Sequence, residues 1–168
     1  VINLIELILN EYGLLNSIKC VLITNGSMVN RVHVKKGLKK LAKMNGEVWF
    51  KIDSATPTGI ATINKIRGSN ISTLKRLKVS AELCPTWIQT CVFSYKNKPP
   101  SKAETDAYIN LLKATVSRDI AVKGVLLYGV ERPSLQPEAK VIEKLPESWL
   151  QEFALSLNQL PFDITITP

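Results

Sequence analysis

The 168-residue sequence has little of what most metal-binding and catalytic sites require. It contains three cysteines, Cys20, Cys84 and Cys91, and a single histidine, His33. No two of the cysteines have the short spacing of zinc or iron–sulfur ligands, and an odd number of them makes no disulfide framework. We therefore expect no metal site, and reduced thiols in the cytoplasm.

Other common catalytic patterns are missing as well. His33 lies in a basic segment away from the ends of the predicted strands, which disfavours nucleophilic catalysis with a serine or cysteine. The glycines form no phosphate-binding loop, since Gly124 and Gly129 fall in one predicted strand and Gly68 stands alone. The sequence indicates no hydrolase, kinase or dinucleotide enzyme, and we assign no catalytic residue.

No apolar run reaches the ~20 residues that cross a bilayer, and no basic, cleavable leader opens the sequence. These absences predict a cytoplasmic protein without a membrane partner. The composition, 45% hydrophobic and 21% charged, is typical of a globular chain. Its length suits one domain with a substantial core, and we expect residues 1–168 to form it.

The net charge of +8 comes entirely from the first half of the chain. Residues 1–84 contain 13 basic and 5 acidic side chains, whereas residues 85–168 contain 9 of each. Four lysines share one face of a predicted helix: Lys36, Lys39, Lys40 and Lys43. They indicate either an RNA-binding surface or a solvated helix face, and the absence of interleaved aromatic residues favours the second.

Helical and strand patterns alternate along the chain. Apolar runs predict strands at 20–23, 48–52, 87–93, 122–130 and 162–167, the first of them fully buried. Amphipathic spacing predicts helices at 2–15, before Asn45, around 74–81, and starting at Ser101 and Pro146, with a short turn after Pro57. Glu104 stands at capping-box spacing from Ser101. Loops are predicted at 95–100 and in the connection that carries Pro133 and Pro137 and leads to Pro146. This alternation predicts an α/β fold, either a partial (β/α) barrel or an open parallel sheet of about five strands covered by helices.

Ligands of parallel α/β folds bind where the strands reach their carboxyl ends. The polar side chains near these ends are therefore candidate binding residues: Asn25, Ser27, Asp53, Ser54, Gln89, Tyr128 and Arg132. A spacing of two places Lys51 and Asp53 on the same face of one strand. If that face lines a barrel, the two opposite charges meet inside it, as part of a site or as a structural ion pair.

Four motifs at these strand ends follow one another in the order found in radical S-adenosylmethionine (radical SAM) proteins. They are residues 22–28 (LITNGSM), 48–54 (VWFKIDS), 63–68 (INKIRG) and 128–133 (YGVERP). The correspondence runs over nearly the whole chain. It resembles most the iron–sulfur oxidoreductase branch related to tRNA wyosine-forming enzymes.

The resemblance implies a partial barrel of six βα units, of which this sequence has the third onward. In the family, a three-cysteine loop in the first unit holds a [4Fe–4S] cluster, and a glycine-rich motif after the second strand binds the methionyl amine of S-adenosylmethionine. The sequence contains neither motif. The resemblance thus implies an N-terminally truncated domain that cannot cleave S-adenosylmethionine alone, because no electron reaches the sulfonium without the cluster.

By the same resemblance, the seven candidate residues correspond to positions that approach the adenosine, the carboxylate or the substrate. Truncation also leaves the 20–24 strand with an unpaired, apolar edge. We expect this edge to be covered by a second copy of the chain, by the leading helix or by a complementary polypeptide, and we favour a homodimer.

Three functions follow as hypotheses. The favoured one is a folded, self-associating radical-SAM-like module without autonomous catalysis. The second is a subunit of a split radical SAM enzyme, with the cluster and S-adenosylmethionine bound only when a partner completes the site. The third is a basic RNA-binding module.

Overall fold

The computed structural model describes residues 1–15, 17–65, 70–132, 135 and 137–167. The α-helices in this part of the chain are α1 (Ile2–Glu11), α2 (Val32–Lys43), α3 (Pro57–Ile63), α4 (Asn70–Leu83), α5 (Lys102–Ser117) and α6 (Glu147–Leu157). The strands are β1 (Val21–Thr24), β2 (Glu47–Lys51), β3 (Thr86–Cys91), β4 (Ser94–Tyr95), β5 (Gly124–Tyr128), β6 (Ile142–Glu143) and β7 (Asp163–Thr167). A 3-10 helix, η1 (Pro137–Val141), precedes β6.

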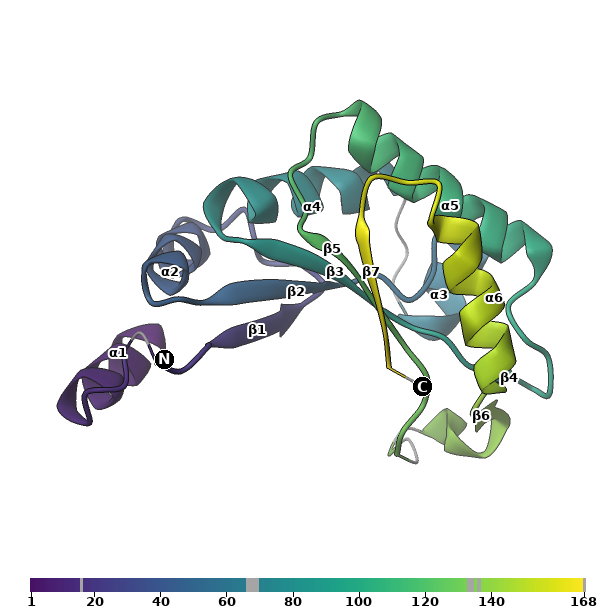
Figure 1. Ribbon diagram of the computed structural model, residues 1–168, viewed down its shortest axis with the longest axis horizontal. Coiled ribbons are helices and arrows are strands. Elements are labelled where there is room, and N and C mark those ends of the chain that lie inside the picture. Colours follow the sequence, from purple (N-terminus) through teal and green to yellow (C-terminus); the bar gives the residue numbers. More distant parts are fainter. Residues whose placement is uncertain (16, 66–69, 133–134, 136, 168) are drawn as a thin grey trace.

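Five strands form one parallel sheet in the order β1-β2-β3-β5-β7 (Figure 1). The predicted α/β fold is confirmed. Each strand of this sheet lies beside the one before it, and right-handed crossovers then carry the connecting helices to the same face. The sheet therefore winds in one direction, as a barrel does, rather than in two directions as a doubly wound sheet does.

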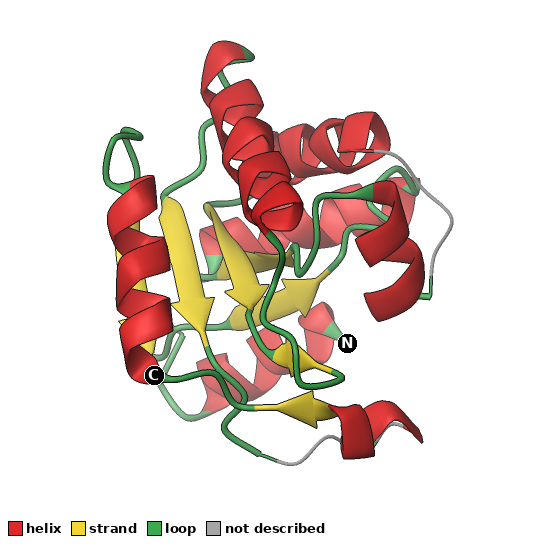
Figure 2. Cartoon of the chain, turned by 90° about the vertical axis from the view of Figure 1, so that its right-hand side faces the viewer, coloured by secondary structure: helices red, strands yellow, loops and turns green. Residues whose placement is uncertain are grey.

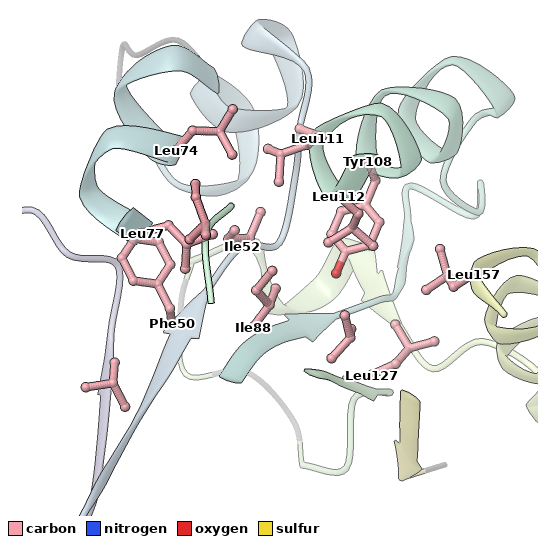
Figure 3. Packing of buried hydrophobic residues seen from close by; sticks show 14 of the residues in the cluster. Phe50, Ile52, Leu74, Leu77, Ile88, Tyr108, Leu111, Leu112, Leu127 and Leu157 are labelled. Carbon is pink, nitrogen blue, oxygen red and sulfur yellow. The ribbon is translucent and has the colours of Figure 1, made fainter. Parts of the chain in front are cut away.

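The helix-covered face of the sheet carries the hydrophobic core. Phe50 of β2 and Ile88 of β3 point to this side and are fully buried, with Leu77 of α4 and Leu112 of α5 packed over them (Figure 3). Burying a side chain of this size contributes about 1.5–3 kcal/mol. These contacts attach the helices to one side of the sheet.

The alternate residues of the strands point to the opposite side, which we call the open face. Its central side chains are Trp49, Lys51, Trp87, Gln89, Leu126 and Tyr128. Of these six residues only Gln89 is buried, while the others stay partly accessible. The open face thus combines aromatic and polar side chains where the other face has a closed core.

The first strand is present, but the prediction that it is fully buried is wrong. Val21, Leu22 and Ile23 are 39%, 36% and 53% exposed. Within the described residues β1 pairs only with β2, so it forms an edge of the sheet. Its apolar side chains and its outer row of backbone groups are therefore accessible.

The leading helix packs against α2 at the left-hand end of the molecule in Figure 1. Lys40 of α2 contacts both Glu6 and Asn3 of α1. This packing leaves Leu4 and Leu7 60% and 65% exposed. The helix ends at Glu11, earlier than the predicted residue 15.

A pair of short antiparallel strands, β4 and β6, lies beyond the carboxyl ends of the sheet strands (Figure 2). The sequence patterns predicted loops at both places. No described helix has the length and apolar character that a membrane crossing needs.

The turn after β1 requires glycine at position 26. Gly26 has a φ of +68°, and a Cβ there would lie 2.5 Å from the ring of the fully buried Phe50. Gly13 has a similar φ of +65°, but a Cβ there would meet nothing within 4 Å. A substitution at Gly13 would therefore introduce backbone strain alone, whereas one at Gly26 would introduce both backbone strain and steric overlap.

We predict that Gly13→Ala lowers the free energy of unfolding by about 1 kcal/mol, because of the left-handed backbone alone. Gly26→Ala lowers it by about 2–4 kcal/mol, because the Phe50 ring must also move. Urea denaturation followed by circular dichroism measures both. Equal losses in the two variants would contradict the packing of Phe50 against this turn.

Candidate functional site

An ion pair on the open face joins the carboxyl ends of three strands. The Lys51 amine donates to Asp53 Oδ1 at 2.9 Å and lies 3.2 Å from the Tyr128 hydroxyl of β5. The backbone N–H of Cys91, at the end of β3, donates to the same Asp53 oxygen at 3.2 Å. Asn64 Nδ2 donates to Asp53 Oδ2 at 3.4 Å. The predicted pairing of Lys51 and Asp53 is confirmed, and Asp53 is its centre.

This ion pair is largely shielded from water. The Asp53 side chain is 4% exposed, and that of Lys51 is 35% exposed. Burial alone would lower the pKa of Lys51, but the adjacent Asp53 carboxylate outweighs it and raises the pKa above its ordinary value. Burial raises the pKa of Tyr128 as well, which keeps its hydroxyl protonated. The cluster therefore holds an ammonium, a carboxylate and a neutral phenol near neutral pH.

Gln89 lies on the open face beside this ion pair, since Lys51 is its partner in the β2–β3 register. The residue is 8% exposed, and its Oε1 is buried without a hydrogen-bond partner among the described residues. A buried acceptor without a donor costs about 1–3 kcal/mol. Such an atom is a candidate contact for a ligand that brings an N–H or O–H group to the sheet.

A second charged cluster lies at the amino ends of the same strands. Glu47 accepts a hydrogen bond from the Trp49 indole N–H at 3.0 Å and pairs with Lys123 at 3.4 Å. Lys123 also lies over the Trp87 ring, 5.3 Å from its centroid. A Cβ at Gly124 would lie 2.5 Å from that ring, so the absence of a side chain there makes room for Trp87.

Ser54 points away from the ion pair and toward α5. Its hydroxyl donates to Glu104 Oε1 at 2.6 Å, and the Ala55 N–H donates to the same oxygen at 2.8 Å. Thr56 completes the set, with its hydroxyl donating to Glu104 Oε2 at 2.6 Å. Glu104 thus fixes the loop that follows Asp53.

Only part of this arrangement was predictable from the sequence. Ser101 caps α5 as predicted, accepting a hydrogen bond from the Glu104 N–H at 3.2 Å. The Glu104 side chain, however, turns to Ser54 and its neighbours, about fifty residues earlier in the chain. Only its place in the capping motif marked Glu104 in advance.

The other candidate residues lie apart from the Asp53 cluster. Asn25 Oδ1 accepts a hydrogen bond from the Ser27 N–H at 3.0 Å, which shapes the turn after β1. Arg132 is exposed beyond the end of β5. The motif residues 66–68 and Pro133 lie outside the described part of the chain.

No family model matches this sequence, and no curated protein does. Thirteen chains of solved structures are similar to it. One is the crystal structure of a domain of pyruvate-formate lyase-activating enzyme from Bacteroides vulgatus ATCC 8482, with a TM-score of 0.63 and 14% identity. The match covers 99% of this chain and 91% of that one.

The chain therefore shares an α/β fold with that domain. At 14% identity, the likeness bears on the fold and not on the activity. It agrees with the predicted α/β fold of about five parallel strands covered by helices. The Asp53 cluster lies at the carboxyl edge, where ligands of such α/β folds bind.

The cysteines of this chain do not fit an iron–sulfur cluster. Cys84 is buried between α4 and β3, while Cys91 ends β3 and Cys20 precedes β1. Burial raises the pKa of both Cys84 and Cys91 to about 11, whereas a cluster is held by thiolates. No group of three or more His, Cys, Asp or Glu side chains suited to a metal occurs among the described residues.

The basic face of α2 is partly engaged within the fold. Lys40 is half-buried and contacts Glu6 and Asn3, as noted above. Lys36, Lys39 and Lys43 are exposed. A phosphate-rich partner would therefore meet three of the four predicted lysines.

We predict that Glu104→Gln destabilises the protein and flattens the dependence of its stability on pH. Burial would raise the pKa of Glu104, but the hydrogen bonds from Ser54, Thr56 and Ala55 outweigh it and lower the pKa below its ordinary value. A carboxyl whose pKa is depressed by folding stabilises the protein above its unfolded pKa, and this contribution is lost as the pH falls through the folded pKa.

Urea denaturation at pH 7 checks this expectation, with a loss of about 2 kcal/mol in Glu104→Gln. The difference between the variant and the parent narrows as the pH falls below the ordinary pKa of a glutamate, and it is lost as the pH passes the lowered pKa of Glu104 in the folded protein. Glu152→Gln, at an exposed position of α6, is the matched control. A loss of the same size at every pH would contradict the role of the Glu104 charge.

Proposed function

We propose that this chain is a self-associating radical-SAM-like module without catalysis of its own. The observation that carries the proposal is the position of the three thiols, which lie on separate elements and do not converge on one point. In this proposal the chain is related most nearly to the wyosine-related branch, and its own residues hold no cluster. The Asp53 ion pair then stabilises the carboxyl edge.

Self-association through β1 follows from the chemistry of that edge. The strand has no charged residue and no proline, the features with which exposed sheet edges usually prevent pairing. A twofold axis beside β1 would pair two identical edges, with each strand satisfying the backbone groups of the other. The chain carries a net charge of +8, but β1 itself has no charged side chain, so pairing two β1 strands brings no like charges of these strands together. A second copy is therefore the occupant that we propose.

A split enzyme is the second candidate, and Gln89 favours it. Its Oε1 is buried without a hydrogen-bond partner among the residues described, and it faces the side of the sheet on which the family's cofactor approaches. A module without a ligand has no use for such an atom, since a leucine there would be less costly. In this second proposal a partner polypeptide pairs with β1, supplies the cluster, and completes the site for S-adenosylmethionine.

Anaerobic reconstitution with iron and sulfide separates the two candidates. We expect the isolated chain to bind no cluster and to stay colourless after desalting. A brown, stoichiometric cluster in the isolated chain would overturn the first proposal. Co-expression with a polypeptide that carries a three-cysteine motif, giving a brown complex whose S-adenosylmethionine binding is lost in Gln89→Leu, would establish the second.

The self-association proposal predicts a dimer at micromolar concentration in multi-angle light scattering. Ile23→Lys gives a monomer, because a lysine on an edge strand opposes pairing. The side chain is 53% exposed, so the substitution leaves the core intact. Leu155→Lys, at a 67% exposed position of α6, keeps the dimer. A wild-type monomer, or a dimer that survives Ile23→Lys, would refute pairing through β1.

A further inference from the structure

A cavity of about 460 Å³ lies at the carboxyl edge of the sheet, enclosed by α3, the 92–100 loop, α5 and α6. Thr90 and Tyr108 line it, and both belong to the helix-covered side, where their hydroxyls lie 2.6 Å apart. The cavity therefore lies mainly on the helix-covered side of the sheet, while Asp53 and Cys91 of the open-face cluster also contribute to its lining. Its volume is in the range of small-molecule sites, about 300–1,000 Å³.

The two carboxylates that line this cavity already have partners within the protein. Glu104 accepts from Ser54, Ala55 and Thr56, and Asp53 is paired with Lys51. Their oxygens are therefore engaged before a ligand enters.

Aromatic and other apolar groups make up much of the remaining lining: Ile63, Phe93, Tyr95, Pro99, Trp149 and Phe153. The rings are tilted to one another, with Trp149 and Phe153 centroids 5.2 Å apart at an angle of 37°. Tilted and offset rings of this kind favour a further aromatic ring among them. The main body of a fitting ligand is therefore planar and apolar.

One cation lines the cavity from the 92–100 loop. Lys98 is exposed, and no ion pair within the described residues engages it. The loop is held in place, because the Tyr95 N–H donates to the Lys98 carbonyl at 2.9 Å and the Lys96 N–H to the Val141 carbonyl at 2.7 Å. A ligand with an anionic group at one end can therefore pair with the Lys98 amine, which extends from a loop whose backbone is held in place.

We infer that this cavity binds an aromatic carboxylate, with the ring between α5 and α6 and the carboxylate at Lys98. The inference does not depend on the function proposed above, because neither the β1 edge nor Gln89 lines the cavity. The carboxylate is placed at Lys98 because the other charged groups of the lining, Asp53 and Glu104, are themselves acidic.

Calorimetric titration with indole-3-propionate tests the inference, with tryptamine as the probe of opposite charge. We expect indole-3-propionate to bind with a Kd below about 1 mM and tryptamine to bind more weakly. Absence of binding, or tighter binding of tryptamine, would overturn the inference.

Variants locate the site. Ala103→Phe, at an exposed position of α5 that lines the cavity, fills it and weakens binding at least tenfold. Thr58→Phe does the same from α3, should the first variant misfold by circular dichroism. Lys98→Ala weakens binding about two- to fivefold, whereas Lys96→Ala, in the same loop but outside the lining, leaves it unchanged. Full binding in both cavity-filling variants would place the ligand elsewhere.

Discussion

Parallel pairing of consecutive strands, each beside the previous one, is the constraint from which the other features of this structure follow. It places the connecting helices on one side of the sheet. The core that stabilises the fold therefore lies entirely between the sheet and those helices, around Phe50, Ile88 and Leu112. The opposite side needs no closed core, and polar and aromatic residues occupy it. The same winding leaves β1 at the edge of the sheet, where its apolar side chains are exposed and those of the inner strands are largely buried.

The Asp53 carboxylate links elements that the backbone hydrogen bonds of the sheet do not join. It binds the side chain of Lys51, the backbone of Cys91 and the amide of Asn64, and Lys51 extends the contact to Tyr128. Removing Lys51 would leave the Asp53 carboxylate, which is 4% exposed, without its ammonium partner. The carboxyl edge is thus held in a defined geometry without a ligand. Beside it, the buried Gln89 Oε1 has no hydrogen-bond partner in the part of the chain that the structure describes.

Local sequence patterns were sufficient to predict the five sheet strands, because each is a run of apolar or alternating residues long enough to show its period. They failed for β4 and β6, since two-residue strands show no periodicity and depend on pairing across almost fifty residues. The ion pair of Lys51 and Asp53 was predictable because residues two positions apart along a strand point to the same face. The contact of Lys51 with Tyr128, 77 residues away, was not, and Glu104 was marked only as part of a helix cap. Long-range partners of this kind depend on how the elements pack.

The open face depends on the lack of a Cβ atom at Gly124. A methyl group at this position would lie 2.3 Å from the Asp163 carbonyl oxygen as well as 2.5 Å from the Trp87 ring. Any larger residue would therefore displace either the Trp87 indole from the sheet or β7 from β5. The position of the Trp87 ring and the pairing of β5 with β7 both depend on the lack of a side chain at Gly124. We therefore expect these two features to change together as the sequence diverges.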